Sequence, residues 1–287
     1  MNISISCPYT CGELFQGSLE GQPCLVSAPI AIYSEAVIGN GKPPSPLPGK
    51  ASKALDNLPL KEKPVISLRQ NLPSSRGYGT STADIGSVLH ASAKWAGMSL
   101  SETEATRIAI SVEPSDSSLL PGLALLDHRQ GRVMTILGET PDIALIVFDP
   151  GGAVDSVKFN LQDWSSELKK YEYAHREIFN LLEHGIRKSD IASIGEAATR
   201  SAIIHENILP TFRLNHLLYL AKQVRASGVC RAHSGTIFGL LFPADDFDPN
   251  SILAFLRKQV SKSIQVWQTK MTGGGWIDTS KDLENHK

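Results

Sequence analysis

Residues 72–83, Leu-Pro-Ser-Ser-Arg-Gly-Tyr-Gly-Thr-Ser-Thr-Ala, constrain the fold more than any other stretch of this 287-residue chain. Glycine permits positive φ and lets the backbone approach a ligand closely, so Gly77 and Gly79 suit a tight loop. From Thr82 onward, apolar residues recur at helical spacing, which predicts an amphipathic helix that begins beside the glycines. The unpaired amides at a helix N-terminus favour an anion. The pattern alone therefore fits a phosphate-binding loop and an exposed loop with a helix cap about equally well.

Three known nucleotide-binding motifs are missing from this stretch. No Gly-Lys-Ser/Thr follows the glycines, which excludes a Walker loop, and Thr82 stands where a dinucleotide-binding loop needs its third glycine. The chain also lacks the His-Arg-Asp sequence of protein kinases. Any phosphate site here belongs to a different class.

The composition indicates an enzyme-sized globular protein. Charged residues make up 20% of the chain and the formal net charge is -1, which disfavours binding to nucleic acid or to an anionic membrane. No apolar run reaches membrane-spanning length and the N-terminus lacks a basic leader, so we expect a cytoplasmic protein. The four cysteines are too few and too irregularly spaced for a disulfide scaffold, and we expect reduced thiols.

The hydrophobic pattern predicts a mixed α and β chain. Strands are expected at residues 3–6, 25–33, 65–69, 123–127, 132–137, 143–148, 236–242 and 264–268. Helices are expected after the glycines and at residues 101–112, 166–184, 189–207, 213–226 and 251–260. Residues 8–17 are too polar and glycine-bounded for a strand interior and are expected to form a loop. Pro29 predicts that its strand lies at an edge or bends. Residues 149–152 form the expected seam between two halves.

A second polar segment follows the helix at residues 101–112. Ser101 and Glu104 have the form of a capping box at its start, and Pro114 ends it. Glu113 and Asp116 then stand three residues apart in a serine-rich loop. Taken alone, the sequence of this loop is typical of a solvent-exposed acidic turn.

Three motifs together resemble those of the GHMP kinases, the superfamily of galactokinase, homoserine kinase and mevalonate kinase. Pro73, Gly77, Gly79, Ser81 and Ala83 match its second motif, Pro-x-x-x-Gly-Leu-Gly-Ser-Ser-Ala-Ala. The opening Pro-x-x-Cys-Gly-Glu-Leu-x-Gln-Gly at residues 8–17 and Ala-His-Ser-Gly-Thr at residues 232–236 are similar to the branch that contains the L-threonine kinases of adenosylcobalamin synthesis.

The resemblance implies an α+β fold, the GHMP kinase fold. It combines an N-terminal ribosomal-protein-S5-like domain, here residues 1–150, with a C-terminal ferredoxin-like domain, here residues 151–287. It also implies ATP and Mg²⁺ as cofactors and a small-molecule acceptor, and it leaves a homodimer open. The glycine-rich residues 273–275 form either a turn or a loop of close approach.

The resemblance also implies roles for individual residues. Asp116 would accept or orient the proton of the acceptor hydroxyl, or else bind a substrate ammonium. Ser81 and either Glu113 or Glu104 would bind Mg²⁺. ATP would be held by Pro73, Ser74, Ser75, Arg76, Gly77, Tyr78, Gly79, Thr80, Ser81 and Thr82. The acceptor would be held by Cys11, Gly12, Glu13, Gln16, His233, Ser234 and Gly235, with Arg231 a further candidate for a carboxylate.

The activity that the resemblance implies is ATP-dependent phosphorylation of the L-threonine hydroxyl, giving O-phospho-L-threonine and ADP. Two alternatives stay open at the level of the sequence. One is a homoserine or isoprenoid-precursor kinase, and the other is a non-catalytic protein of the same fold that binds a partner through the cleft.

Overall fold

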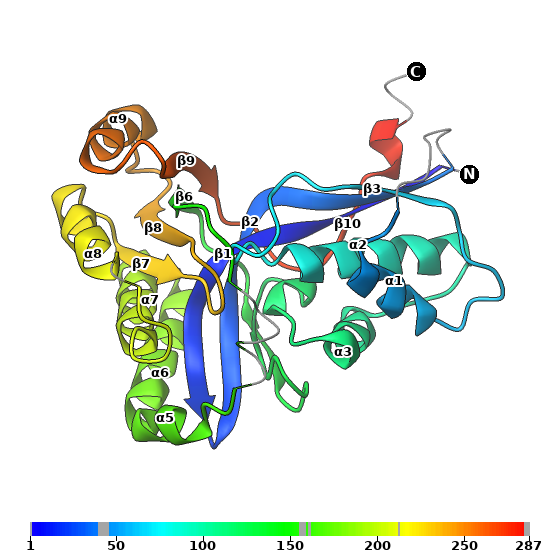
Figure 1. The fold of residues 1–287 in the computed structure, drawn as a ribbon, viewed down its shortest axis with the longest axis horizontal. Coiled ribbons are helices and arrows are strands. Elements are labelled where there is room, and N and C mark those ends of the chain that lie inside the picture. Colours follow the sequence, from blue (N-terminus) through cyan, green and yellow to red (C-terminus); the bar gives the residue numbers. More distant parts are fainter. Residues whose placement is uncertain (1, 40–45, 155–158, 160–161, 212, 284–287) are drawn as a thin grey trace.

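One long β-hairpin runs through the middle of a ten-stranded sheet and organises the fold (Figure 1). The computed structural model describes residues 2–39, 46–154, 159, 162–211 and 213–283. The strands are β1 (Ile3–Leu19), β2 (Gln22–Ile38), β3 (Ile66–Arg69), β4 (Leu123–Leu126), β5 (Met134–Gly138), β6 (Ile143–Asp149), β7 (Gly228–Arg231), β8 (Phe238–Pro243), β9 (Gln265–Lys270) and β10 (Ile277–Asp278). Their order is β5-β4-β2-β1-β7-β8-β6-β9, while β3 pairs with β2 and β10 with β1. All of these pairings are antiparallel.

Strands β1 and β2 form the hairpin, and each is 17 residues long. The expected loop at residues 8–17 is therefore wrong, because this segment lies inside β1. The pairing register shifts between Pro8 and Tyr9 and again between Thr10 and Glu13. Such irregularities admit residues that a regular strand excludes and re-aim side chains. Residues 8–17, the first of the three motifs, are thus part of the sheet although they are polar.

Pro29 lies opposite Thr10, directly beside these register shifts. Its strand is not at an edge, because β2 pairs with β1 and also with β3 and β4. The alternative prediction, a bend in the strand, agrees with the curved course of the hairpin in Figure 1. The register shifts of the hairpin lie next to the pairing of Thr10 with Pro29.

Helices flank the sheet in two groups. They are α1 (Gly49–Asp56), α2 (Thr80–Trp95), α3 (Glu102–Val112), α5 (Ser165–Lys170), α6 (Glu172–Lys188), α7 (Ile191–His205), α8 (Leu214–Gln223) and α9 (Pro249–Gln259), with short 3-10 turns at Ser117–Leu119 and Ser280–Leu283. In Figure 1, α1 to α3 gather beside one end of the hairpin, α5 to α7 lie along the other end, and α8 and α9 lie farther out beside β7 to β9. Helix α2 packs on β1 and β2, and α7 packs on β1 and β7.

The helix ends follow local sequence signals. Ser101 and Glu104 form the expected capping box at the start of α3. Asp190 and Asp248 cap α7 and α9 through their carboxylates. The helix expected at residues 166–184 is instead two helices, α5 and α6, separated at Tyr171.

The main hydrophobic core draws residues from both halves of the chain, for example Ile85 of α2 with Leu182 of α6. A second cluster joins β6 and β8 to α8 and α9. Strand β6 precedes residue 150, yet it pairs with β8 and β9, which follow it. The domain boundary at residue 150 stays a prediction.

The C-terminal glycines meet the backbone of the segment before β4. The Gly274 amide donates a hydrogen bond of 2.8 Å to the Gly122 carbonyl, and a Cβ at Gly274 would lie 2.3 Å from the carbonyl oxygen of Leu120. Residues 273–275 therefore form a loop of close approach between two backbones, which was one of the two predictions for this segment.

The cysteines and the helices agree with a chain that has no disulfide scaffold and no membrane-spanning helix among its described residues. Cys7, Cys11, Cys24 and Cys230 are all buried free thiols, as predicted. Among the helices of the described residues, none is long and apolar enough to cross a membrane.

Candidate active site

The phosphate loop, defined here as residues 73–82, connects the segment after β3 to α2. Gly77 has φ 99° and Gly79 has φ 62°, so both glycines adopt the left-handed backbone that the sequence analysis expected. Gly79 is the N-cap of α2 and offers no side chain to its first amides. The amides at the start of α2 are therefore available to an anion.

Neighbouring segments hold the phosphate loop in place. The Thr10 amide donates to the Tyr78 carbonyl at 2.9 Å, and the amides of Thr236 and Ile237 donate to the Arg76 carbonyl at 2.8 and 3.1 Å. A Cβ at Gly77 would lie 2.2 Å from the Cβ of Ala232. The three motifs, far apart in the sequence, thus meet backbone to backbone.

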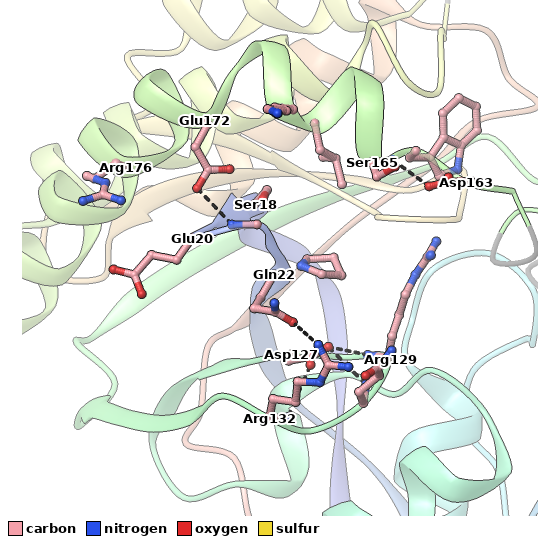
Figure 2. A pocket seen from close by; sticks show the side chains of 16 residues that line it. Ser18, Glu20, Gln22, Asp127, Arg129, Arg132, Asp163, Ser165, Glu172 and Arg176 are labelled. Atoms are coloured by element: carbon pink, nitrogen blue, oxygen red, sulfur yellow. Dashed lines mark hydrogen bonds between the residues drawn. The ribbon is translucent and has the colours of Figure 1, made fainter.

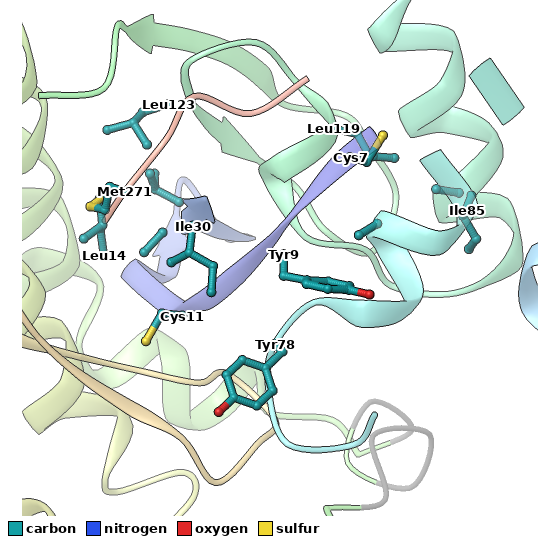
Figure 3. Packing of buried hydrophobic residues seen from close by; sticks show 14 of the residues in the cluster. Cys7, Tyr9, Cys11, Leu14, Ile30, Tyr78, Ile85, Leu119, Leu123 and Met271 are labelled. Carbon is teal, nitrogen blue, oxygen red and sulfur yellow. The ribbon is translucent and has the colours of Figure 1, made fainter. Parts of the chain in front are cut away.

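Two side chains of the phosphate loop bind protein groups. Arg76 Nη1 and the Tyr78 hydroxyl donate to the same oxygen, Asp149 Oδ2, at 2.8 and 2.9 Å. Tyr78 is buried in the core beside Tyr9 and Cys11 (Figure 3). Burial raises the pKa of its hydroxyl, and the charge of Asp149 raises it further. Arg76 and Tyr78 therefore anchor the loop.

The acidic loop, residues 113–118, lies against the first turn of α2. The Ser81 hydroxyl donates to Glu113 Oε1, and Lys50 Nζ forms an ion pair with Glu113 Oε2. The Thr82 hydroxyl donates to Asp116 Oδ2 at 3.2 Å, and the Asp116 amide donates back to the Thr82 hydroxyl at 3.1 Å. The predicted metal ligands, Ser81 and Glu113, are in contact.

Glu104, the other candidate metal ligand, is occupied elsewhere. Its carboxylate accepts hydrogen bonds from the amide and hydroxyl of Ser101 in the capping box. It does not line the cavity beside Ser81. Of the two glutamates, Glu113 is the one that faces Ser81.

A cavity of about 150 Å³ opens between the two loops. From the phosphate loop it is lined by Ser74, Ser75, Gly77, Tyr78, Gly79, Thr80, Ser81 and Thr82. From other segments it is lined by Glu13, Leu25, Lys50, Glu113, Pro114, Ser115, Asp116, His128, His233 and Ser234. Among the predicted ATP-binding residues, Pro73 and Arg76 do not line it.

The predicted acceptor residues divide into two groups. Glu13, His233 and Ser234 line the cavity, and Gln16 reaches it through His233, whose Nδ1 lies 2.9 Å from Gln16 Oε1. The remaining three pack against protein: Gly12 against Arg231, Gly235 against Arg76, and Cys11 inside the core. These three residues shape the backbone of the site and do not line it.

Arg231, the candidate for a substrate carboxylate, is also engaged. It is 1% exposed and donates to Glu206 Oε2 at 2.6 Å and to the Leu209 carbonyl at 2.9 Å. The assignment is corrected: Arg231 is buried in a structural ion pair, and its side chain does not line the cavity.

The pKa values of two carboxyl groups that line the cavity are raised above their usual values. Burial raises the pKa of Asp116 from 3.8 to about 6. Burial also raises the pKa of Glu13 well above its usual value, and the neighbouring Asp116 carboxyl raises it further. Perturbed acids gathered in a cavity are typical of functional sites.

Sequence reasoning missed Lys50 and His128. Lys50 lies on α1 and neutralises Glu113, and no motif marks it. His128 follows β4, and its ring packs against the His233 ring in an edge-to-face arrangement, with ring centroids 4.8 Å apart. Burial lowers the pKa of His128 to about 3, which keeps its ring neutral at physiological pH. A turn residue of this kind gives no signal in a single sequence.

A larger cavity of about 710 Å³ lies at the tip of the hairpin, between the β4–β5 turn and helices α5 and α6 (Figure 2). Arg132 donates to Gln22 Oε1 at 3.0 Å on one side of it, and the Gly21 amide donates to Glu172 on the other. None of the predicted site residues lines it, so the smaller cavity is the candidate active site.

Comparisons with known proteins agree with this geometry. Residues 48–120 match the profile of the GHMP kinases N terminal domain. The chain is 29% identical to the L-threonine kinase of Salmonella typhimurium over 250 residues, which cover 84% of this chain and 83% of that protein. It is 28% identical to the L-threonine kinase of Citrobacter freundii over 254 residues, 86% of this chain and 88% of that protein.

The fold also matches a solved structure along most of its length. Homoserine kinase from Cytophaga hutchinsonii superimposes with a TM-score of 0.70 at 15% identity, covering 96% of this chain and 97% of that one. The phosphate loop and the acidic loop both lie within the profile match at residues 48–120. The chain therefore belongs to the GHMP kinase superfamily and is an ATP-dependent small-molecule kinase.

Proposed function

We propose that the protein transfers the γ-phosphoryl group of ATP to the side-chain hydroxyl of L-threonine, giving O-phospho-L-threonine and ADP. The observation that carries the proposal is the placement of Asp116 against Thr82, at the start of α2 and in the same cavity as Glu13. The two L-threonine kinases that match most of the chain support the choice of substrate.

The phosphate loop would hold the triphosphate mainly by its backbone. The positive φ angles of Gly77 and Gly79 and the free amides of Thr80 and Ser81 at the start of α2 suit a polyanion. Phosphoryl transfer requires positioning and charge neutralisation more than covalent chemistry by the protein. A rigid loop tied to β1 and to residues 236–237 meets the need for positioning.

Ser81 and Glu113 fit a magnesium ion. Their hydroxyl and carboxylate oxygens already touch, and hard oxygen donors are the ligands Mg²⁺ prefers. The described residues contain no cluster of three or more His, Cys, Asp or Glu side chains that could hold a metal alone. Mg²⁺ commonly takes one or two protein ligands and completes its shell with phosphate oxygens and water. When bound, it neutralises the negative charge on the transferred group.

Asp116 would take the proton of the acceptor. As the threonine oxygen forms its bond to the γ-phosphorus, the bond from that phosphorus to the bridging oxygen breaks and ADP leaves. The acceptor proton moves to the Asp116 carboxylate. A pKa of about 6 leaves this group ionised at neutral pH yet basic enough to bind a proton, which suits a general base.

The motifs resemble those of the L-threonine kinases of adenosylcobalamin synthesis, and this resemblance suggests how the product is used. O-phospho-L-threonine would supply the aminopropanol linker of that cofactor. This assignment depends on threonine being the acceptor.

Coupled measurement of ADP release with L-threonine, L-serine, L-homoserine and mevalonate tests the proposal. We expect the highest kcat/KM with L-threonine. Turnover of homoserine with no turnover of threonine would reject the substrate. If ADP is released with none of the four acceptors, the result would favour a non-catalytic role for the cleft.

A further inference from the structure

Two neighbouring carboxyl groups, those of Glu13 and Asp116, line the cavity. Glu13 projects from the irregular part of β1 and is 2% exposed, and Asp116 comes from the acidic loop. Glu13 Oε2 is buried and has no hydrogen-bond partner within the described part of the chain. An ionisable oxygen left without a partner in a protein interior is costly, and its presence requires an explanation.

Gly79 brings Asp116 and the first motif together. A Cβ at Gly79 would lie 2.7 Å from Asp116 Oδ2 and 2.8 Å from the hydroxyl of Thr10. That hydroxyl is also buried without a partner among the described residues. The unpaired hydroxyl of Thr10 therefore lies near Asp116, the group that would contact the acceptor hydroxyl, and the Glu13 carboxyl neighbours the same group.

Among the described residues that line the cavity, no cationic side chain is free to balance this pair. Its ionisable lining consists of Glu13, Lys50, Glu113, Asp116, His128 and His233. Lys50 is paired with Glu113 on the other side of Ser81. Burial keeps both histidines neutral by lowering their pKa values. Burial raises the pKa of both carboxyl groups, and a positive charge on the ligand would hold both of them in the ionised form.

We infer that the acceptor supplies this charge as an ammonium group on the carbon next to its hydroxyl, so that the enzyme selects vicinal amino alcohols. The inference rests on the proposed kinase function and narrows its substrate class. Two adjacent carboxyl groups can receive a hydroxyl and an ammonium only if these sit close together on the ligand. Charge-assisted hydrogen bonds of this kind are about twice as strong as neutral ones.

The carboxylate of threonine lacks a comparable partner in the cavity. The only cationic side chain in the described lining is engaged with Glu113, so the acceptor carboxylate meets no free positive charge there. The ammonium would then decide recognition, and the carboxylate would contribute little. Glu13 is the binding residue for the ammonium, and Asp116 remains the group that contacts the reacting hydroxyl.

Three acceptors of the same carbon configuration test this directly in the wild-type enzyme. They are L-threonine, (R)-1-amino-2-propanol, which lacks the carboxylate, and (R)-3-hydroxybutyrate, which lacks the ammonium. We expect kcat/KM for the aminopropanol within about tenfold of that for threonine, and a loss of about a hundredfold or more for hydroxybutyrate. Equal turnover of hydroxybutyrate and threonine would overturn the inference, as would strict dependence on the carboxylate.

Glu13→Gln keeps the shape of the side chain and removes its charge. We expect KM for L-threonine to rise about tenfold or more while KM for ATP stays within about twofold. Glu20→Gln, at the exposed tip of the same hairpin, is the matched control and should change neither constant. Glu13→Asp, which retains the charge, should recover part of the loss. Unchanged KM for threonine in Glu13→Gln would contradict the assignment.

These results separate the inference from the proposed function. If the aminopropanol is phosphorylated and threonine is not, threonine kinase activity is rejected while the amino alcohol class stands. If threonine is phosphorylated and Glu13→Gln behaves as the wild type, the inference fails and the proposed function stands. Absence of turnover with every acceptor rejects both.

Discussion

The hydroxyl of Tyr78 donates a hydrogen bond of 2.9 Å to Asp149 Oδ2, which joins the phosphate loop to the end of β6. Arg76 donates to the same oxygen, while Asp149 Oδ1 accepts from the Gly151 amide. One buried carboxylate at the end of β6 therefore fixes the loop. The family pattern has leucine at position 78, so this contact depends on the tyrosine in this chain.

Tyr78→Phe removes this bond and leaves the ring in place. We expect KM for ATP to rise about threefold to tenfold, because the Asp149 carboxylate loses one buried partner and the loop is held less tightly. KM for the acceptor should change less. Steady-state kinetics with varied ATP measures the effect, and Tyr173→Phe, whose ring is 77% exposed, serves as control. An unchanged KM for ATP would show that Arg76 suffices to hold the loop.

Gly79→Ala should damage both the loop and the position of Asp116, the proposed general base. The backbone at φ 62° strains any residue with a Cβ, and that Cβ would lie 2.7 Å from Asp116 Oδ2. We expect a loss of stability of about 1–3 kcal/mol together with a large fall in kcat. Gly21 has a similar φ of 74°, and a Cβ there would have nothing within 4 Å. Gly21→Ala therefore measures the effect of backbone strain without a steric clash. Equal kinetic effects of both variants would exclude a specific clash at Asp116.

Ser81→Ala and Glu113→Gln test the magnesium assignment. Ser81→Ala removes the hydroxyl oxygen of the contacting pair, and Glu113→Gln removes the negative charge and one of the two carboxylate oxygens. We therefore expect the Mg²⁺ concentration for half-maximal activity to rise about tenfold or more in each variant. Titration of MgCl₂ at saturating ATP measures this concentration. Glu62→Gln, an exposed carboxylate outside the cavity, is the control. A fall in kcat with an unchanged Mg²⁺ requirement would argue against metal binding at this pair.

The protonation of Asp116 should make the activity fall at acidic pH. Burial raises its pKa to about 6, so protonation at lower pH removes the base and kcat/KM should fall below about pH 6. Asp116→Asn should lower kcat by about 100- to 10,000-fold and abolish this limb of the profile. Retention of the limb in the variant would assign it to another group. A pH-independent rate between about pH 5 and 8 in the wild type would count against Asp116 as the base.

Asp84 should make stability depend on pH. It is buried on α2, and burial raises its pKa from 3.8 to about 6 although Ser34 and Gln70 donate hydrogen bonds to it. A raised acid pKa means that the folded state binds the proton more tightly than the unfolded state. Stability is therefore highest below about pH 4 with respect to this group and falls as pH rises toward 6 and beyond, by about 3 kcal/mol in all.

Asp84→Asn removes this titration. The difference in unfolding free energy between the variant and the wild type should shift by up to about 3 kcal/mol in favour of the variant between pH 4 and pH 7. Denaturant unfolding at several pH values measures it. Parallel stability curves for the two proteins would show that the ionised carboxylate carries no penalty.

Local signals in the sequence predicted most of the helices and several strands. The capping box at Ser101 and the apolar run of β6 depend on neighbouring residues alone, and both are present as predicted. The long hairpin was not predictable in this way. Its first strand contains Pro8, Gly12 and several polar residues, which resemble a loop locally, and only pairing with β2 and β7 makes them part of a sheet.

For this protein, the sequence alone determined the phosphate loop, because the left-handed backbone at Gly77 and Gly79 and the start of α2 are local properties of residue type. Tertiary structure alone decided which charged groups face the cavity. Arg231 was drawn into an ion pair with Glu206, Glu104 into a cap, and Lys50 toward Glu113. Burial and pairing arise from segments distant in the chain, and those interactions, which no local pattern records, set the charge of the site.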